Sequence, residues 1–218
     1  MSYSGIIEMD LRSLANEVKK KAPQIRKDAE SGIETLLVLA KKYPNNPKKM
    51  RSTDYVTPFI DCLNDESVSG KAQEIAVSGL HHILSYNLAS EATTSTIIDI
   101  LNDRLCSEDT SSSFGSRIIQ VFPVMLENSG FVMPERKLQS VFNHLAQTLC
   151  AEDSSSTPFN AASACFQQML ISLIKQISPF CKENPKPTSS KVYDSLREKA
   201  PKAIADNTYC AVFWYVLQ

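Results

Sequence analysis

The sequence has few glycines, no long hydrophobic run and no catalytic signature, and each shortage excludes a class of protein. Its six glycines are scattered, without the G-x-G-x-x-G or G-x-x-x-x-G-K-[ST] spacing of nucleotide-binding loops. No apolar run reaches the ~20 residues that a transmembrane helix needs, and residues 1–5 lack the apolar core of a secretory signal. A nucleophile motif such as G-x-S-x-G is also missing. We therefore expect a cytoplasmic protein that is not an enzyme and binds no cofactor.

Metal-binding and redox residues are sparse as well. Of the three histidines, His81 and His82 are adjacent, so they point about 100° apart on a helix, and His144 stands alone. The six cysteines form no Cys-x-x-Cys pair. Cys106 and Cys150 adjoin leucines that we expect in the core, and free cysteine is among the most buried residue types. The pattern predicts buried thiols rather than a metal site or a disulfide framework.

An internal repeat organises the chain. The run Leu149–Asp153, followed by serines and Phe159, repeats the run Leu105–Asp109, followed by serines and Phe114. The two copies are 44 residues apart, within the ~40–47 residue period of HEAT and armadillo repeats. A weaker third copy ends at Asn64-Asp65-Glu66. The sequence therefore predicts an all-α, armadillo/HEAT-like α-solenoid of roughly ten helices, because a helix pair of this kind buries its apolar faces only by stacking on its neighbours.

Apolar residues recur at intervals of three and four, the spacing of one buried helix face. Pro23 separates the first two helices, and the second should end near Lys42. Pro123 interrupts the stripe from Phe114 to Leu126 and predicts a kink, whereas Gly79 predicts a close approach of two helices. The expected core positions include Ile7, Leu11, Leu14, Val18, Ile25, Ala29, Ile33, Leu36, Leu37, Ala40, Val68, Ala72, Ala76, Ile83, Leu84, Leu138, Val141, Leu145, Ala162, Met169 and Leu173.

Charge is distributed unevenly, although the net charge is only −1. Residues 1–51 carry eleven Lys and Arg against six Asp and Glu, residues 52–160 carry five against fourteen, and residues 161–218 carry seven against four. A solvated surface explains this pattern, but so does a basic end that meets an anionic membrane or an acidic partner. The acidic middle section argues against nucleic-acid binding. The candidate membrane- or partner-binding residues are Lys19, Lys20, Lys21, Arg26 and Lys27.

The C-terminal stretch 209–217 is apolar nearly all round. A solenoid's terminal repeat needs a polar outer face, so the sequence looks like part of a longer chain. Phe213, Trp214 and Tyr215 are candidate self-association residues, although a buried final helix explains them equally well. Residues 1–178 are predicted to form the solenoid domain, and 179–218 a linker with terminal helices of the same solenoid.

Particular segments are similar to a known family. Asp10–Leu14, Lys19–Pro23 and Ala29–Ile33 resemble the start of the Golgi monensin-sensitivity family, relatives of the large Arf guanine-nucleotide exchange factors. Asn160–Leu170 resembles the Ala-x-Ala-x-x-x-Gln-Met-Leu helix near the end of that family's N-terminal DCB (dimerisation and cyclophilin-binding) domain.

This resemblance implies a non-catalytic, homodimeric scaffold domain in Golgi and endosomal traffic. The family works peripherally on trans-Golgi and endosome membranes and contacts downstream domains of its own chain. The resemblance also implies contacts with a Dopey-type partner and an Arf-like GTPase. The alternative that the residues leave open is a HEAT-type adaptor that binds basic peptides in an acidic groove.

Overall fold

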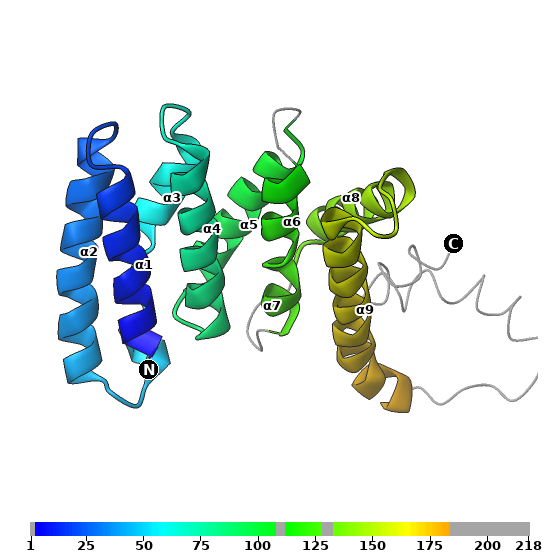
Figure 1. Ribbon diagram of the computed structural model, residues 1–218. Coiled ribbons are helices and arrows are strands. Elements are labelled where there is room, and N and C mark those ends of the chain that lie inside the picture. Colours follow the sequence, from blue (N-terminus) through cyan, green and yellow to red (C-terminus); the bar gives the residue numbers. More distant parts are fainter. Residues whose placement is uncertain (1–2, 108–111, 128–132, 184–218) are drawn as a thin grey trace, which may run out of the picture. The chain divides into compact units, whose positions relative to one another are not determined.

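The computed structural model describes residues 3–107, 112–127 and 133–183, and its regular elements over these ranges are all helical (Figure 1). The predicted all-α class is confirmed. The chain divides into two compact units, residues 1–131 and 132–218, each considered by itself below. The terminal helices expected within 184–218 lie outside the described residues, and the predicted boundary at residue 178 stays a prediction.

Unit 1 contains consecutive helical hairpins. Its elements are α1 (Tyr3–Glu17), α2 (Pro23–Lys42), the 3₁₀ turn η1 (Pro47–Met50), α3 (Thr57–Asn64), α4 (Gly70–Ser85), α5 (Glu91–Leu105), α6 (Ser112–Ile119) and α7 (Phe122–Glu127).

These helices stack in two layers. One layer runs from α1 to α4 to α6 and α7, and the other from α2 to α3 to α5 (Figure 1). The order within the first hairpin is reversed relative to the next two, so the chain crosses from α2 to α3 inside one layer. That crossing is the long connection 43–56, which contains η1. Side-by-side hairpins in two layers are the packing that a helical-repeat protein requires.

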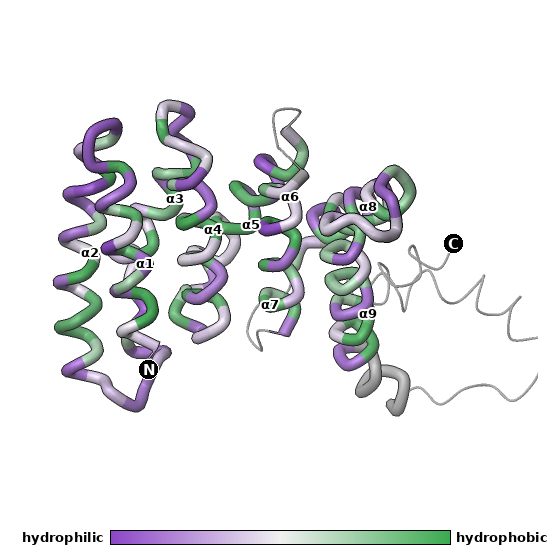
Figure 2. The backbone as a smooth tube through the Cα atoms, in the orientation of Figure 1, coloured by the Kyte–Doolittle hydropathy of each residue, from purple (hydrophilic) through white to green (hydrophobic). Residues whose placement is uncertain are grey.

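The predicted apolar faces of α1 and α2 are buried, apart from Leu37 and the half-buried Ala40. Ile7, Leu11 and Leu14 of α1 are fully enclosed, and Ile33 and Leu36 of α2 are buried. Leu37, which we expected in the core, is 44% exposed. Adjacent helical residues point about 100° apart, so Leu36 completes the buried face and Leu37 lies outside it. Figure 2 shows that the C-terminal half of α2 is largely hydrophobic.

Two glycines allow close packing between elements of unit 1. At Gly79 of α4, an added Cβ would overlap the ring of Phe59 in α3, which confirms the predicted close helix approach. At Gly32 of α2, an added Cβ would lie 2.9 Å from the carbonyl oxygen of Asp54 and 3.0 Å from Cα of Tyr55. Both glycines therefore bring a helix backbone against a neighbouring element.

The prediction of a kink at Pro123 is wrong, because the chain forms two separate helices there instead of one bent helix. The helix stops at Ile119, and Pro123 lies in the first turn of a separate helix, α7. The amide of Val121 donates to the carbonyl of Ile118 at 3.0 Å, which closes a tight turn between the two helices. A proline costs little in the first turn because its missing N–H has no helical partner there. The residue therefore starts a helix instead of bending one.

Unit 2 contains α8 (Glu135–Ala151) and α9 (Thr157–Glu183) among its described residues. Pro134 precedes the first helix, and the cap of the second is Ser156, whose Oγ accepts from the amide of Phe159 at 3.2 Å. The rings of Phe142 and Phe166 meet edge to face with centroids 5.4 Å apart. Both repeat copies are therefore helix–loop–helix units, but α9 is continuous where the upstream copy is divided into α6 and α7.

The prediction of buried thiols is correct for two cysteines and wrong for two others. Burial encloses Cys62 and Cys165, and it raises their pKa to about 12 and about 11. Cys106 and Cys150 are exposed. Each lies at the end of a helix, one residue beyond the last leucine of its stripe; Leu105 is buried and Leu149 half-buried, whereas the thiols lie outside the buried face.

Candidate functional site: two basic ends of one hairpin

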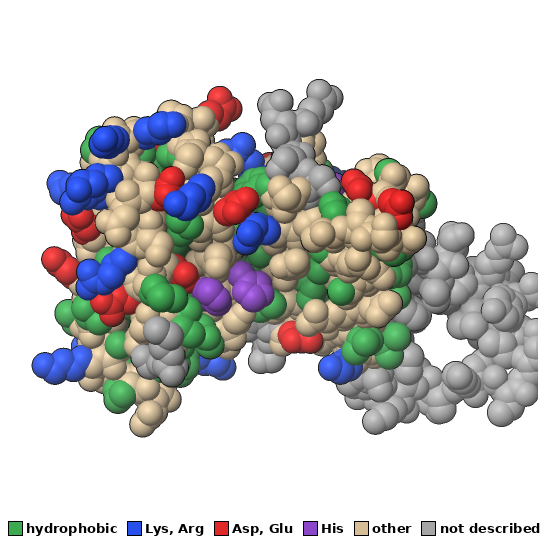
Figure 3. Space-filling view, viewed as in Figure 1, with side chains coloured by type: hydrophobic (Ala, Val, Ile, Leu, Met, Phe, Trp, Pro, Cys, Tyr) green, Lys and Arg blue, Asp and Glu red, His purple; other side chains and the backbone are tan. Residues whose placement is uncertain are grey.

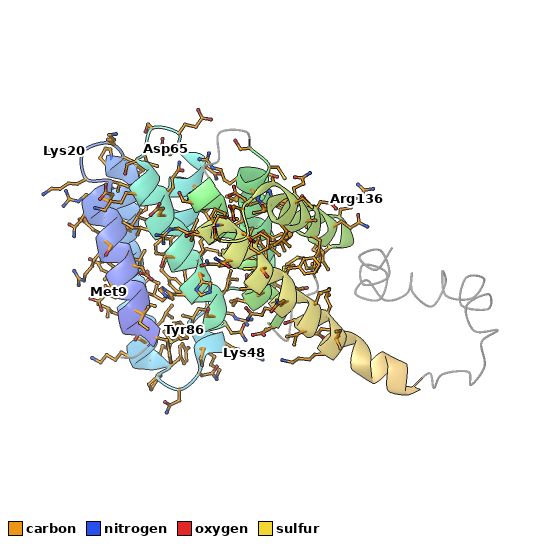
Figure 4. The ribbon with its side chains drawn as sticks, turned by 45° about the vertical axis from the view of Figure 1, so that its right-hand side comes forward. Met9, Lys20, Lys48, Asp65, Tyr86 and Arg136 are labelled. Carbon is orange, nitrogen blue, oxygen red and sulfur yellow. The ribbon has the colours of Figure 1, made fainter. Side chains whose placement is uncertain are left out.

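The predicted basic cluster lies at the tip of the first hairpin. Lys19, Lys20 and Lys21 are exposed in the turn between α1 and α2, because α1 ends at Glu17. Figure 4 shows Lys20 at the same end of unit 1 as Asp65, in the turn between α3 and α4. We call this region, residues 17–30 and 65–71, the Lys20 end.

Acidic groups accompany the basic ones at the Lys20 end. Arg26 pairs with Glu30 at 2.8 Å, and Lys71 pairs with Glu17 at 2.9 Å. The hydrogen bond from Lys71 chiefly lowers the pKa of Glu17, with help from the Ser69 hydroxyl and the charge of Lys21. Figure 3 shows basic and acidic side chains intermingled over this part of the surface. Of the five predicted residues, Arg26 is therefore paired within its own helix, whereas the three turn lysines and Lys27 are exposed.

A second basic cluster occupies the opposite end of α2. Lys41 and Lys42 form its last turn, and Lys48 and Lys49 lie on η1; all four are exposed. The ammonium groups of Lys42 and Lys49 lie 5.3 and 5.8 Å from the ring centroid of Tyr43. We call residues 41–50, with the loop 86–88 to which they are tied, the Lys48 end. Figure 4 shows Lys48 far from Lys20 and on the side of Tyr86.

Buried contacts hold the Lys48 end in place. The Tyr55 hydroxyl lies 2.8 Å from the carbonyl oxygen of Met50 and 3.0 Å from that of Leu88, and these two oxygens share its proton. Burial raises the pKa of Tyr55 to about 12. The Arg51 guanidinium donates to the carbonyl of Asn87 at 3.1 Å and to its side-chain oxygen. A segment that looks like a polar loop in the sequence is thus fixed to the α4–α5 connection.

The sequence carries a signal for this cluster that a count of basic residues misses. Residues 35–53 include four lysines and one arginine but no Asp or Glu. A count of basic residues alone favoured the run Lys19–Lys21. A search for basic residues without acidic neighbours would have favoured residues 35–53. The arginine, Arg51, is used for anchoring, so the exposed charge of the Lys48 end comes from lysine.

Exposed apolar residues adjoin the Lys48 end. Val38 is 65% exposed and Leu37 is 44% exposed, both in the C-terminal half of α2. Positions three and four apart are neighbours on a helix surface, so Val38 adjoins Lys41 and Lys42, and Leu37 adjoins Lys41. The outer side of this helix end is therefore both apolar and basic.

Two of the three histidines, His81 and His82, lie on α4 in unit 1, and His82 makes a contact between helices. His82 Nδ1 lies 2.7 Å from a carboxylate oxygen of Asp10, which joins α4 to α1, and its ring stacks on Tyr86. Burial raises the pKa of Asp10, and the hydrogen bond and charge of His82 oppose that rise. Burial, with the neighbouring His82, lowers the pKa of His81. The described residues contain no cluster of three or more groups suited to a metal ion.

The remaining predicted site belongs to the C-terminal stretch. Phe213, Trp214 and Tyr215 are outside the described residues, so their role in self-association stays a prediction. Among the helices that are described, none is both long and apolar enough to cross a lipid bilayer.

Comparison with known proteins gives one family and two relatives. The domain family described as "Mon2/Sec7/BIG1-like, dimerisation and cyclophilin-binding domain" (DCB) matches residues 2–178. Protein MON2 homolog from Xenopus laevis is 31% identical over 98 residues, and the human Protein MON2 homolog is 30% identical over 98 residues. The match covers 44% of this chain and 6% of each relative, so the chain spans only a small part of their length. No solved structure matches significantly.

Proposed function

Because the chain belongs to the DCB domain family of the Mon2/Sec7/BIG1 type, we propose that it is a non-catalytic scaffold domain in Golgi and endosomal membrane traffic. The observation that carries this proposal is the family match over residues 2–178. The hairpin packing of unit 1 supports it, since stacked hairpins offer extended surfaces for protein contacts.

Self-association is the first activity we propose, since the family description names dimerisation. Phe213, Trp214 and Tyr215 are our candidates for this contact. Downstream domains of the same full-length protein are a separate partner that the resemblance suggests. A Dopey-type partner and an Arf-like GTPase are the further partners that the resemblance suggests.

The Lys20 end is our candidate surface for a protein partner. Its lysines Lys19, Lys20, Lys21 and Lys27 lie among acids such as Glu17 and Glu30, so the surface presents a pattern of both signs. A mixed pattern of charges selects a partner with the complementary arrangement, because any other arrangement brings like charges together. This surface is therefore better suited to one specific protein than to anionic partners in general.

Sedimentation velocity over a concentration series tests the proposal. We expect the sedimentation coefficient of the 218-residue chain to rise with concentration, and Trp214→Ala to reduce that rise. A single monomeric species up to high micromolar concentration would refute self-association. Lys27→Ala offers a matched surface control that should sediment like the parent chain.

A further inference from the structure

We propose that the Lys48 end is a docking surface for an anionic lipid membrane. The inference rests on the proposed function as a membrane-traffic scaffold and names the surface that would meet the bilayer. The surface consists of Lys41, Lys42, Lys48 and Lys49, with Val38 beside them.

Uncompensated charge is the first argument. Residues 35–53 contain no acidic residue, and none of the four lysines takes part in an ion pair among the described residues. An anionic leaflet attracts such lysines without requiring a particular geometry, and each is worth about a fivefold gain in membrane partition. The Lys20 end differs because Glu17 and Glu30 lie among its basic residues, where they pair with Lys71 and Arg26.

The arrangement around Tyr43 is the second argument. The ammonium groups of Lys42 and Lys49 approach the same ring, at 5.3 and 5.8 Å. The ring attracts each cation, but two like charges held near one point repel each other, and a nearby anion relieves that repulsion. The helix dipole explains why lysines end α2, but it does not explain Lys48 and Lys49, which lie on the following turn.

Exposed apolar side chains supply the third argument. Val38 is one helical turn from Lys41 and Lys42, so an apolar side chain adjoins the lysines on the outer side of α2. Surfaces that rest on a bilayer combine these two features, with lysines at the headgroups and apolar side chains below them.

A second copy of this chain is a poorer occupant for the same surface. Two-fold pairing through one patch places equivalent residues close together. Here it would bring the lysines of both copies together, and like charges across an interface are strongly unfavourable. Charge complementarity therefore favours the anionic lipid surface.

Rigidity is the last argument. The amide of Lys49 donates to Asn46, the Tyr3 hydroxyl donates to the carbonyl of Pro44 at 2.7 Å, and Met50 is fully buried. The lysines are therefore presented on a fixed backbone, so less conformational entropy is lost on docking.

Flotation with lipid vesicles tests the proposal. We would compare the parent chain with Lys48→Gln plus Lys49→Gln, using vesicles of phosphatidylcholine with phosphatidylserine and vesicles of phosphatidylcholine alone. The expected result is binding to the mixed vesicles only, weakened about 25-fold by the double substitution, since two lysines contribute about fivefold each. Lys19→Gln plus Lys20→Gln, with the same loss of charge, should change binding by less than about threefold.

Equal losses in the two double variants, or no binding of the parent chain to anionic vesicles, would overturn the proposal. Val38→Ser distinguishes a lipid membrane from a second copy of the chain as the occupant of this surface. We expect it to weaken flotation a few-fold and leave sedimentation unchanged. If it abolishes self-association while flotation is unaffected, the surface belongs to a second copy and the inference fails. Sedimentation of the lysine variants distinguishes this failure from that of the proposed function, because self-association has its own readout.

Discussion

The two ends of the first hairpin carry the same kind of residue and differ in everything around it. At the Lys20 end, lysines occupy a short turn and acidic neighbours such as Glu17 and Glu30 accompany them. At the Lys48 end, lysines occur in a stretch without acids and on a segment that buried contacts hold. The difference teaches that a basic run becomes a general anionic-binding surface only where counter-charges are absent.

The ends also differ in how they are attached to the rest of unit 1. At the Lys20 end, buried Val18 and Ala22 flank the lysines, and the ion pairs there lie on the surface and contribute little to stability. At the Lys48 end, the buried Tyr55 hydroxyl and the Arg51 guanidinium hold the end of η1 to residues 87–88. Substitutions that remove the anchors should therefore have unequal effects at the two ends.

Tyr55→Ala should produce the largest effect. The side chain is fully buried, and truncating a buried aromatic residue costs about 3–5 kcal/mol. Tyr55→Phe keeps the ring but leaves two carbonyl oxygens without its hydroxyl, which should cost about 1–2 kcal/mol. Chemical denaturation followed by circular dichroism measures both free energies. If Tyr55→Ala costs less than about 1 kcal/mol, the Lys48 end is not anchored as described.

The sequence predicted the helices well and the two ends poorly, for one physical reason. A buried helix face repeats every three to four residues, so Ile7, Leu11 and Leu14 reveal their burial locally. Anchoring of the Lys48 end depends on residues far apart in the sequence, because Arg51 bonds Asn87, 36 residues away, and Tyr55 bonds Leu88, 33 residues away. Periodicity carries no information about such partners.

The errors in the core have a similar origin. Leu37 belongs to an apolar run, but the edge of the buried face passes between it and Leu36, and only the neighbouring helices determine that edge. Cys106 likewise lies one position beyond its stripe. Local pattern therefore identifies a face to within about one residue, and tertiary packing decides the rest.

Two glycine substitutions, one at each end, test the same comparison and should change stability less than Tyr55→Ala. Gly32→Ala would place a Cβ 2.9 Å from the carbonyl oxygen of Asp54, on the segment that leads away from the Lys48 end. Backbone does not yield easily, so we expect a loss of about 1–3 kcal/mol. Gly70 lies at the Lys20 end with nothing within 4 Å of the added Cβ. Gly70→Ala should be neutral or stabilise by up to about 1 kcal/mol, because it restricts the unfolded chain.

Denaturation curves of the two alanine variants measure this contrast directly. Helix propensity alone would predict the opposite order, because Gly32 lies in the interior of α2, where alanine is favoured by about 1 kcal/mol, whereas Gly70 is the first residue of α4. Similar losses at both positions would mean that α2 and the segment 53–56 are not in close contact.

Glu17→Gln should have the smallest effect, and it should depend on pH. The hydrogen bond from Lys71 lowers the pKa of Glu17 below its ordinary value of 4.5 in the folded state. The stability that this carboxylate contributes is therefore fully present above pH 4.5 and is lost as the pH falls through the folded-state pKa. Glu17→Gln should lower Tm slightly at neutral pH and reduce the fall in Tm below pH 4.5.

Thermal unfolding at about pH 7 and about pH 3, in low and high salt, measures the effect. Salt should shrink the difference at neutral pH, because the pair is exposed to solvent. Lys48→Gln is the control from the other end, where no carboxylate pairs with the lysine among the described residues. It should leave Tm unchanged or raise it, since it removes one of several like charges. If Lys48→Gln lowers Tm with the same pH dependence as Glu17→Gln, the Lys48 end has counter-charges after all. The contrast between the two ends would then disappear.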